Sequence, residues 1–199
     1  MSTAQPIRPD GLDLRTASLA DIAKAVADKR LPPVEQWNPT HCGDSDMRIA
    51  ADGTWFHMGT PIGRPALVKL FSTILRREAD GGYVLVTPVE KLSIAVDDAP
   101  FVAVEATSEG RGRDRTLAFR LLTDELVVAG PDNPLRVETA VDGTPRPYLH
   151  VRGPAERPLE ALINRPVFYQ LADLALDERK DQAEPLGLWS GGVFFAFAD

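Results

Sequence analysis

A close succession of short β-rich segments constrains this chain more than any other feature of its sequence. Between residues 83 and 129, apolar and polar residues alternate, or β-branched and aromatic residues gather, over five segments: 83–86, 92–96, 101–105, 116–122 and 125–129. The connectors between them carry turn residues such as Pro, Gly and Asp. This spacing predicts an antiparallel meander rather than βαβ units.

Two amphipathic helices are predicted before this region. Ser18 can cap a helix that follows a loose N-terminal arm and ends before the two prolines at positions 32 and 33. A second helix is expected to begin at Pro65 and to bury the face that carries Leu67, Leu70, Phe71 and Ile74. Helices and strands in separate runs indicate an α+β fold.

One motif recurs in the two halves of the chain. The hairpin turn Asp52-Gly53 is followed by Arg64-Pro65, and the turn Asp142-Gly143 is followed by Arg157-Pro158. A helix is expected after each Arg-Pro pair. Arg165-Pro166 should kink or restart the second one, because proline cannot donate the helical hydrogen bond. The shared order of elements predicts two duplicated units of hairpin, helix and antiparallel strands.

These patterns divide the chain into an N-terminal arm and helix over residues 1–30, a first α+β unit over 31–106 and a second, barrel-like unit over 107–199. The net charge of −7 argues against a general nucleic-acid binder, because phosphate neutralisation needs a basic surface. No apolar run approaches the ~20 residues that a membrane helix needs. The single cysteine fits a reducing environment, so a cytoplasmic location is expected.

The stretch WNPTHCGDSDM, residues 37–47, is predicted as a loop that leads into the first hairpin. Its ligating side chains match neither the spacing of a structural zinc site nor that of a calcium loop. His41 and Cys42 are neighbours in sequence, and such neighbours rarely point at one another. Ser190 lacks the spacing of a nucleophile elbow. We therefore predict no metal site, no catalytic residue and no cofactor.

Arg64 is the main candidate for contact with an anion. It enters a predicted helix, where free N–H groups and the helix dipole favour negative charge. Its spacing from Leu67 and Phe71 places it on the buried face, and a buried arginine needs an anionic partner. That partner is either a structural carboxylate, for which Asp44 and Asp46 are candidates, or a phosphate or carboxylate of a ligand.

Four further residues are candidates for the same ligand. Arg157 holds the position of Arg64 in the second unit, and Arg165 lies where a helix break could free backbone polar groups. Glu90 adjoins an otherwise apolar strand, where it could recognise a ring or simply be an edge-strand carboxylate. Trp55 could stack on a base, although a tryptophan in a chain of this size is usually a core or interface residue.

Four segments together carry a family resemblance: WNPTHCGDSDMRIAADGTWFHMGTPIGR, LVTPVEK, DDAPF and GLWSGGVFF. From about residue 31 to its end, the chain resembles the bacterial family called domain of unknown function 1285. The resemblance implies an α+β fold with a duplicated core and a second half superficially like a pleckstrin-homology barrel. It implies no established activity, and it suggests a nucleotide-like ligand between the halves with a role in signalling.

Three functions follow as alternatives. We favour a non-enzymatic, cytoplasmic ligand-binding or regulatory protein that takes a small anionic, possibly nucleotide-like ligand between its two units. The second is an enzyme of unrecognised type that uses carboxylates and histidines from His41 to His57. The third is a protein-interaction module that uses exposed strands and the arginine-rich tip at residues 111–115.

Overall fold

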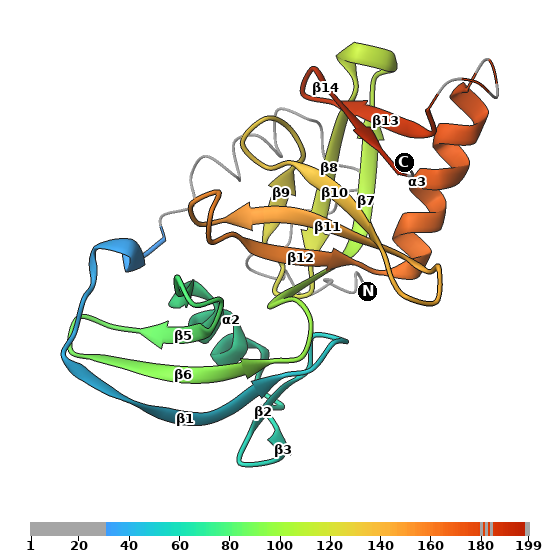
Figure 1. Ribbon diagram of the computed structural model, residues 1–199. Coiled ribbons are helices and arrows are strands. Elements are labelled where there is room, and N and C mark those ends of the chain that lie inside the picture. The colour runs from blue at the N-terminus through green and yellow to red at the C-terminus, as the bar shows by residue number, and fades with distance from the viewer. Residues whose placement is uncertain (1–30, 180, 182, 184, 198–199) are drawn as a thin grey trace, which may run out of the picture.

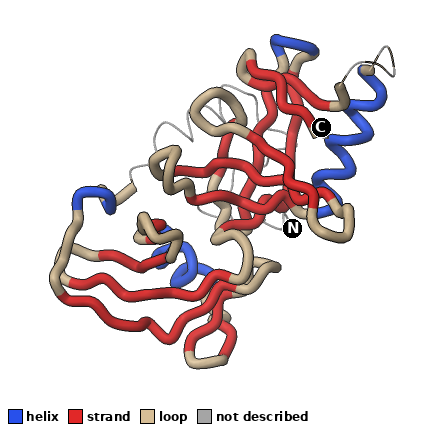
Figure 2. The backbone as a smooth tube through the Cα atoms, viewed as in Figure 1, coloured by secondary structure: helices blue, strands red, loops and turns tan. Residues whose placement is uncertain are grey.

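The computed structural model describes residues 31–179, 181, 183 and 185–197, so the arm and helix predicted over residues 1–30 lie outside the described chain. Within it, two six-stranded sheets, a two-stranded hairpin and two α-helices form a mostly β structure of the α+β type. Figure 2 shows how far strands outweigh helices in both halves. No helix in this part of the chain is long and apolar enough to cross a bilayer.

The first sheet has the strand order β3-β2-β1-β6-β5-β4. Its strands are β1 (His41–Ile49), β2 (Trp55–His57), β3 (Thr60–Pro61), β4 (Leu75–Arg77), β5 (Tyr83–Val86) and β6 (Glu90–Val96). Helix α2 (Pro65–Thr73) packs on its inner face through Val68 and Phe71. The 3-10 helix η1 (Val34–Gln36) covers the outer face near β5, where Val34 meets Val84 and Val86.

The second sheet has the strand order β10-β11-β12-β7-β8-β9. Its strands are β7 (Phe101–Glu109), β8 (Thr116–Leu121), β9 (Leu126–Val128), β10 (Leu135–Thr139), β11 (Pro145–Arg152) and β12 (Leu159–Ile163). The 3-10 helix η2 (Gly112–Asp114) forms the tip between β7 and β8. Helix α3 (Arg165–Glu178) follows β12, and the hairpin of β13 (Gly187–Ser190) and β14 (Val193–Ala196) follows α3. Figure 1 shows α3 along one side of this unit.

The two sheets share one topology. When each is numbered from its own first strand, both have the order 3-2-1-6-5-4. In both, the first and sixth strands lie side by side and run parallel, whereas the other neighbours are antiparallel. The predicted duplication is therefore confirmed at the level of the sheets. The predicted antiparallel meander was wrong between segments 92–96 and 101–105, because these form β6 and β7 in different sheets. The units are also not wholly antiparallel, since the central pair of each sheet joins strands far apart in sequence and is parallel.

The recurring Asp-Gly and Arg-Pro pairs do not lie at equivalent strands of the two sheets. Asp52-Gly53 joins the first two strands of its sheet, but Asp142-Gly143 joins the fourth and fifth strands of the other. The helix expected after Arg157-Pro158 is strand β12, in which alternate residues are buried. That alternation over LEALI is the period of a strand. Arg165-Pro166 then begins a helix instead of kinking one.

Two boundaries also differ from the predictions. Residues 41–47, expected in a loop, belong to β1, because His41 to Asp44 pair in register with Glu90 to Ser93 of β6. The first sheet ends at Val96 and the second begins at Phe101, so the unit boundary expected at residues 106 and 107 falls inside β7. In α2, Leu70 is 59% exposed, so the predicted buried face is narrower than expected.

The two units pack on one shared hydrophobic core. One cluster of buried residues runs from Met47 and Trp55 in the first sheet to Leu149 and Phe168 in the second unit. Arg152 donates from Nη1 to the Glu125 carboxylate, with an Nη1–Oε2 distance of 3.0 Å, and from Nη2 to the Ser72 carbonyl at the end of α2. In Figure 1, β6 leads directly into β7 where the two sheets meet.

Candidate functional site

The start of α3 is fixed at the centre of the second sheet. Asn164 caps the helix, because its Oδ1 accepts a hydrogen bond from the Val167 N–H at 3.0 Å. Pro166 occupies the first turn, where its fixed φ suits a helix and no N–H is needed. The Asn164 N–H donates to the Ala103 carbonyl of β7 at 3.1 Å. The helix start is therefore tied to the strand that connects the two units.

A cavity of about 160 Å³ lies between the start of α3 and the hairpin of β10 and β11; we call it the α3 cavity. Cavities that enclose drug-sized ligands measure roughly 300–1,000 Å³. The α3 cavity therefore suits one small group, or the end of a larger ligand. Its lining residues are Thr144, Pro145, Arg146, Pro147, Leu162, Ile163, Asn164, Arg165, Phe168 and Tyr169.

Two arginines make the α3 cavity cationic. Arg165 is exposed, and its guanidinium has no hydrogen-bond or ion-pair partner among residues 31–179 or the described residues after them. Arg146 uses Nη2 to donate to Asp98 Oδ2 at 2.7 Å, and its side chain remains 44% exposed. Both lie at the N-terminal, positive end of the α3 dipole. This arrangement attracts a small anion.

Asp98 forms a buried network directly behind Arg146. Its other oxygen, Oδ1, accepts from the Tyr148 hydroxyl at 2.8 Å, and the Asp98 side chain is only 10% exposed. Burial, together with the hydrogen bond to Asp98, raises the pKa of Tyr148 to about 12. The pKa of the exposed Asp142 in the adjacent turn is lowered, chiefly by the hydrogen bond from the Thr144 N–H and in small part by the charge of Arg165.

Of the seven residues predicted as ligand contacts, Arg165 lies in this cavity. Asp44 and Asp46 instead shape a β-bulge in β1. Asp44 Oδ1 accepts from the Asp46 N–H at 2.8 Å, and Asp46 has a φ of 53° where the pairing with β6 shifts register. Both carboxylates are exposed, and neither pairs with Arg64 in the described structure. Of the two partners considered for Arg64, the structural carboxylates Asp44 and Asp46 are therefore not observed beside it.

Arg64 occupies the N-cap position of α2 and is exposed, so its expected place on the buried face was wrong. The N-cap residue has extended backbone angles, here φ −109° and ψ 101°. Helical spacing from Leu67 and Phe71 therefore does not predict where its side chain points. The Arg64 side chain has no partner among the residues described.

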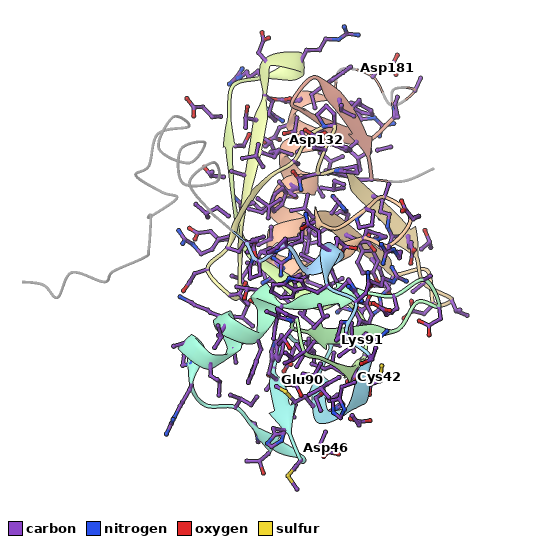
Figure 3. All side chains as sticks on the ribbon, turned by 90° about the vertical axis from the view of Figure 1, so that its left-hand side faces the viewer. Cys42, Asp46, Glu90, Lys91, Asp132 and Asp181 are labelled. Carbon is purple, nitrogen blue, oxygen red and sulfur yellow. The ribbon has the colours of Figure 1, made fainter. Side chains whose placement is uncertain are left out.

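Trp55 and Glu90 belong to the first unit and lie outside the α3 cavity. Trp55 is 3% exposed and stacks on Phe71 with ring centroids 6.4 Å apart, so it is a core residue with no face for a ligand. Glu90 is half-buried at the start of β6, beside His41 of β1. Figure 3 shows Glu90 with Lys91 and Cys42 on the first unit, away from Asp132 on the second.

Arg157 has structural partners that join the two units. Its Nη2 donates to Glu35 Oε2 at 2.9 Å, and its Nη1 donates to the Arg77 carbonyl at 3.2 Å. Glu35 belongs to η1, and Arg77 ends β4. Of the two partners considered for such an arginine, the carboxylate of the protein is the one observed here.

Sequence reasoning missed a second concavity, of about 480 Å³, over the outer face of β10, β11 and β12. Arg136 binds Glu160 through Nε and Nη2, at 2.7 and 2.8 Å, and also donates to Glu138. His150 places its two ring nitrogens 2.9 and 3.0 Å from the carbonyl oxygens of Asp132 and Gly153. The alternation of charged residues along these strands is the signal that could have revealed it.

The charges of this second concavity do not favour an anion. Hydrogen bonds from Arg136 to Glu160, followed by its hydrogen bond to Glu138, hold the pKa of the guanidinium above its ordinary value. Arg136 already donates hydrogen bonds to two carboxylates, and Asp132 adds a further negative charge to the lining. The α3 cavity is therefore the better candidate for an anionic ligand.

The two alternative functions gain little from the geometry. Within the described residues, no three His, Cys, Asp or Glu side chains gather as metal ligands. His57 pairs with Met47, six residues along β1 from His41, which separates the histidines by about 20 Å at ~3.3 Å per residue. The arginine-rich tip between β7 and β8, considered for protein contacts, uses two of its arginines within the chain. The Arg113 guanidinium lies 4.7 Å from the centroid of the Trp189 ring, and Arg115, which is 2% exposed, forms an ion pair with Glu178.

Comparison with known sequences and structures identifies two consecutive domains. Residues 32–99 match a family described as domain of unknown function (DUF1285), N-terminal domain, and residues 100–197 match protein of unknown function (DUF1285), C-terminal domain. No functionally curated protein matches the chain.

Two crystal structures of DUF1285 family proteins are similar to this chain. The one from Silicibacter pomeroyi DSS-3 is 49% identical, with 90% of this chain and 94% of that chain covered and a TM-score of 0.75. The one from Shewanella baltica OS155 is 27% identical, with 64% of this chain and 90% of that chain covered and a TM-score of 0.48. The first of these extends over both matched domains.

Proposed function

We propose that this chain, which belongs to the DUF1285 family, is a non-enzymatic protein that binds a small anionic ligand in the α3 cavity. The pair of Arg165 and Arg146 at the positive end of α3 carries the proposal. Arg165 has no partner among the described residues, and Arg146 uses one nitrogen for Asp98. An anion there accepts charge-assisted hydrogen bonds from both arginines and interacts favourably with the helix dipole.

The ligand class follows from the size and rim of the cavity. A phosphate or carboxylate group fits a volume of about 160 Å³. Tyr169, which is 58% exposed at the rim, offers an aromatic face to a flat ring carried by that group. A nucleotide-like ligand combines these two features. Because Arg146 also binds Asp98 between the sheets, such a ligand lies next to the joint of the two units, and we propose a regulatory or signalling role for it.

We also propose a coarse similarity of the second unit to a pleckstrin-homology barrel. The support is the order of its elements, in which six strands of one sheet precede helix α3. The helix packs against the sheet through Val167, Phe168 and Leu171, which are buried in the shared core. The α3 cavity lies at the start of this helix, directly after the last strand of the sheet.

Thermal denaturation with inorganic phosphate, pyrophosphate and adenosine monophosphate tests the binding proposal. A ligand that binds only the folded state stabilises it by about 2.7 kcal/mol at 100 times its Kd. For a chain of this length, that corresponds to a rise in Tm of about 5–10 °C. We expect at least one of the three anions to produce such a shift, and calorimetric titration to give one site per chain.

Arg64 provides a matched control for Arg165. Both arginines are exposed beside a proline at the start of a helix, and neither has a partner in the described structure. Arg165→Gln should remove the anion-dependent rise in Tm, whereas Arg64→Gln should retain it. A flat response of the unmodified chain to all three anions, or equal responses of the two variants, contradicts the proposal.

A further inference from the structure

The linker between the two sheets is bound from both sides by arginines. On the first side, Asp97 Oδ2 accepts from Arg48 Nη1 at 2.6 Å, and the Asp97 N–H donates to the Ile49 carbonyl at 3.0 Å. On the second side, Asp98 accepts from Arg146 and Tyr148. The two aspartates are consecutive, yet each is held by a different sheet.

Arg146 belongs to the linker contact and to the α3 cavity at once. Its Nη2 holds Asp98, whereas Nε and Nη1 have no partner among the described residues. Arg136 on the neighbouring strand shows that a guanidinium in this sheet can serve two carboxylates, Glu160 on one edge and Glu138 on the other. Arg146 can bridge Asp98 and a bound anion in the same way.

We infer that an anion in the α3 cavity tightens the joint between the two units through Arg146. The inference rests on the proposed function and adds regulation to it. An anion bound by Nε or Nη1 of Arg146 fixes a side chain that is otherwise 44% exposed, so the ion pair with Asp98 no longer carries the full entropy cost of ordering it. Docking of the units and binding of the anion then favour each other by the same factor.

The route from the cavity to the joint is short. Asn164, in the cavity wall, donates its N–H to the Ala103 carbonyl of β7, three residues after Pro100. Ala99 and Pro100 are buried, so the linker has little freedom of its own. The backbone between Asp97 and Ala103 is therefore the segment in which a change at Arg146 should be measurable.

Amide hydrogen exchange of the full chain, with inorganic phosphate as the probe, tests the inference. Bound phosphate is expected to slow exchange over residues 97–103 about fivefold, the lower end of typical coupling between two sites. Asp98→Asn removes the charge that Arg146 pairs with, and should reduce this effect below about twofold while phosphate still raises Tm. Asp97→Asn is the matched control, because Asp97 binds Arg48 instead, and it should retain the effect.

The outcomes separate this inference from the proposed function. Absence of a rise in Tm of the unmodified chain with phosphate, pyrophosphate and adenosine monophosphate alike refutes both, and absence of a rise with phosphate alone refutes only the coupling as stated for phosphate. A rise that depends on Arg165, with unchanged or faster exchange over residues 97–103, refutes only the coupling. Equal exchange responses of Asp97→Asn and Asp98→Asn refute the coupling as well.

A second variant serves if Asp98→Asn does not fold. Arg146→Lys keeps a positive charge but lacks the two-edged fork of a guanidinium. Phosphate should then bind more weakly, because Arg146 is one of its two proposed ligands, and exchange over residues 97–103 should no longer respond even at phosphate concentrations that restore the Arg165-dependent rise in Tm. A fivefold response that persists in Arg146→Lys overturns the bridging role of Arg146.

Discussion

Alanine at Gly53 should destabilise the protein more than alanine at Gly143, although the two glycines occupy almost identical turns. Their φ values are 84° and 81°, and each N–H donates at 2.9 Å to the carbonyl three residues earlier, in Ala50 and Ala140. Alanine at a positive φ costs about 1–2 kcal/mol, because its Cβ approaches the carbonyl oxygen. This backbone cost is common to both variants and cancels in their comparison.

The difference between the variants arises from the second unit. A Cβ on Gly53 would lie 2.8 Å from Leu122 Cδ2 and 3.0 Å from Val102 Cγ2, whereas a Cβ on Gly143 meets no atom within 4 Å. Leu122 is 52% exposed and can move, but Val102 is buried and stiff at χ1. Overpacking costs about 1–3 kcal/mol. Because Leu122 can yield, we expect the lower part of that range, an additional loss of about 1–2 kcal/mol.

Urea denaturation of both variants measures this difference, and thermal denaturation should show it as a gap of about 2–8 °C in Tm. Equal losses for Gly53→Ala and Gly143→Ala would refute the packing of the first hairpin turn against β7. A larger loss for Gly143→Ala would contradict the reasoning altogether, since that glycine faces open space.

Three further changes test the shared core and the buried network. Arg152→Met should lower the unfolding free energy by about 3 kcal/mol in urea titrations, because Glu125 and the Ser72 carbonyl lose a buried donor, and adding Glu125→Gln should recover part of that loss. Trp55→Ala should cost about 3–5 kcal/mol by the same assay, with phosphate binding retained. Because the pKa of Tyr148 is raised to about 12 in the folded state, its contribution to the unfolding free energy is complete below pH 10 and is lost as the pH rises towards 12. Denaturant titrations over that range should show a smaller fall in the unfolding free energy for Tyr148→Phe.

Local signals in the sequence were sufficient for much of the fold. The turns at Asp52-Gly53 and Asp142-Gly143 were identified because few residues adopt positive φ, and both turns join neighbouring strands as expected. The helix start at Pro65 was found because proline suits the first turn of a helix, and the strand at residues 83–86 because its residues favour strands. Each of these features depends on residues within a few positions of one another.

Features that depend on distant residues were not predicted. The parallel pairing of β1 with β6, and of β12 with β7, joins strands separated by dozens of residues. Residues 41–44 lack a strand pattern of their own and become a strand because β6 supplies hydrogen-bond partners. Over residues 159–163, a short apolar run fitted a helix as well as a strand, an ambiguity that periodicity alone cannot resolve.

A dependence on distant residues also explains why Arg165, and not Arg64, lines the α3 cavity. Both precede or begin a helix with proline in its first turn, and sequence reasoning made Arg64 the main candidate for an anion contact and Arg165 a further one. Only the hairpin of β10 and β11, folded against the start of α3, brings a second arginine and a cavity of about 160 Å³ to Arg165. The start of α3 is therefore a candidate anion site because the hairpin of β10 and β11, some twenty residues earlier in the chain, packs beside it. Substitutions that shift the Asp142-Gly143 turn should weaken anion binding although both arginines are unchanged.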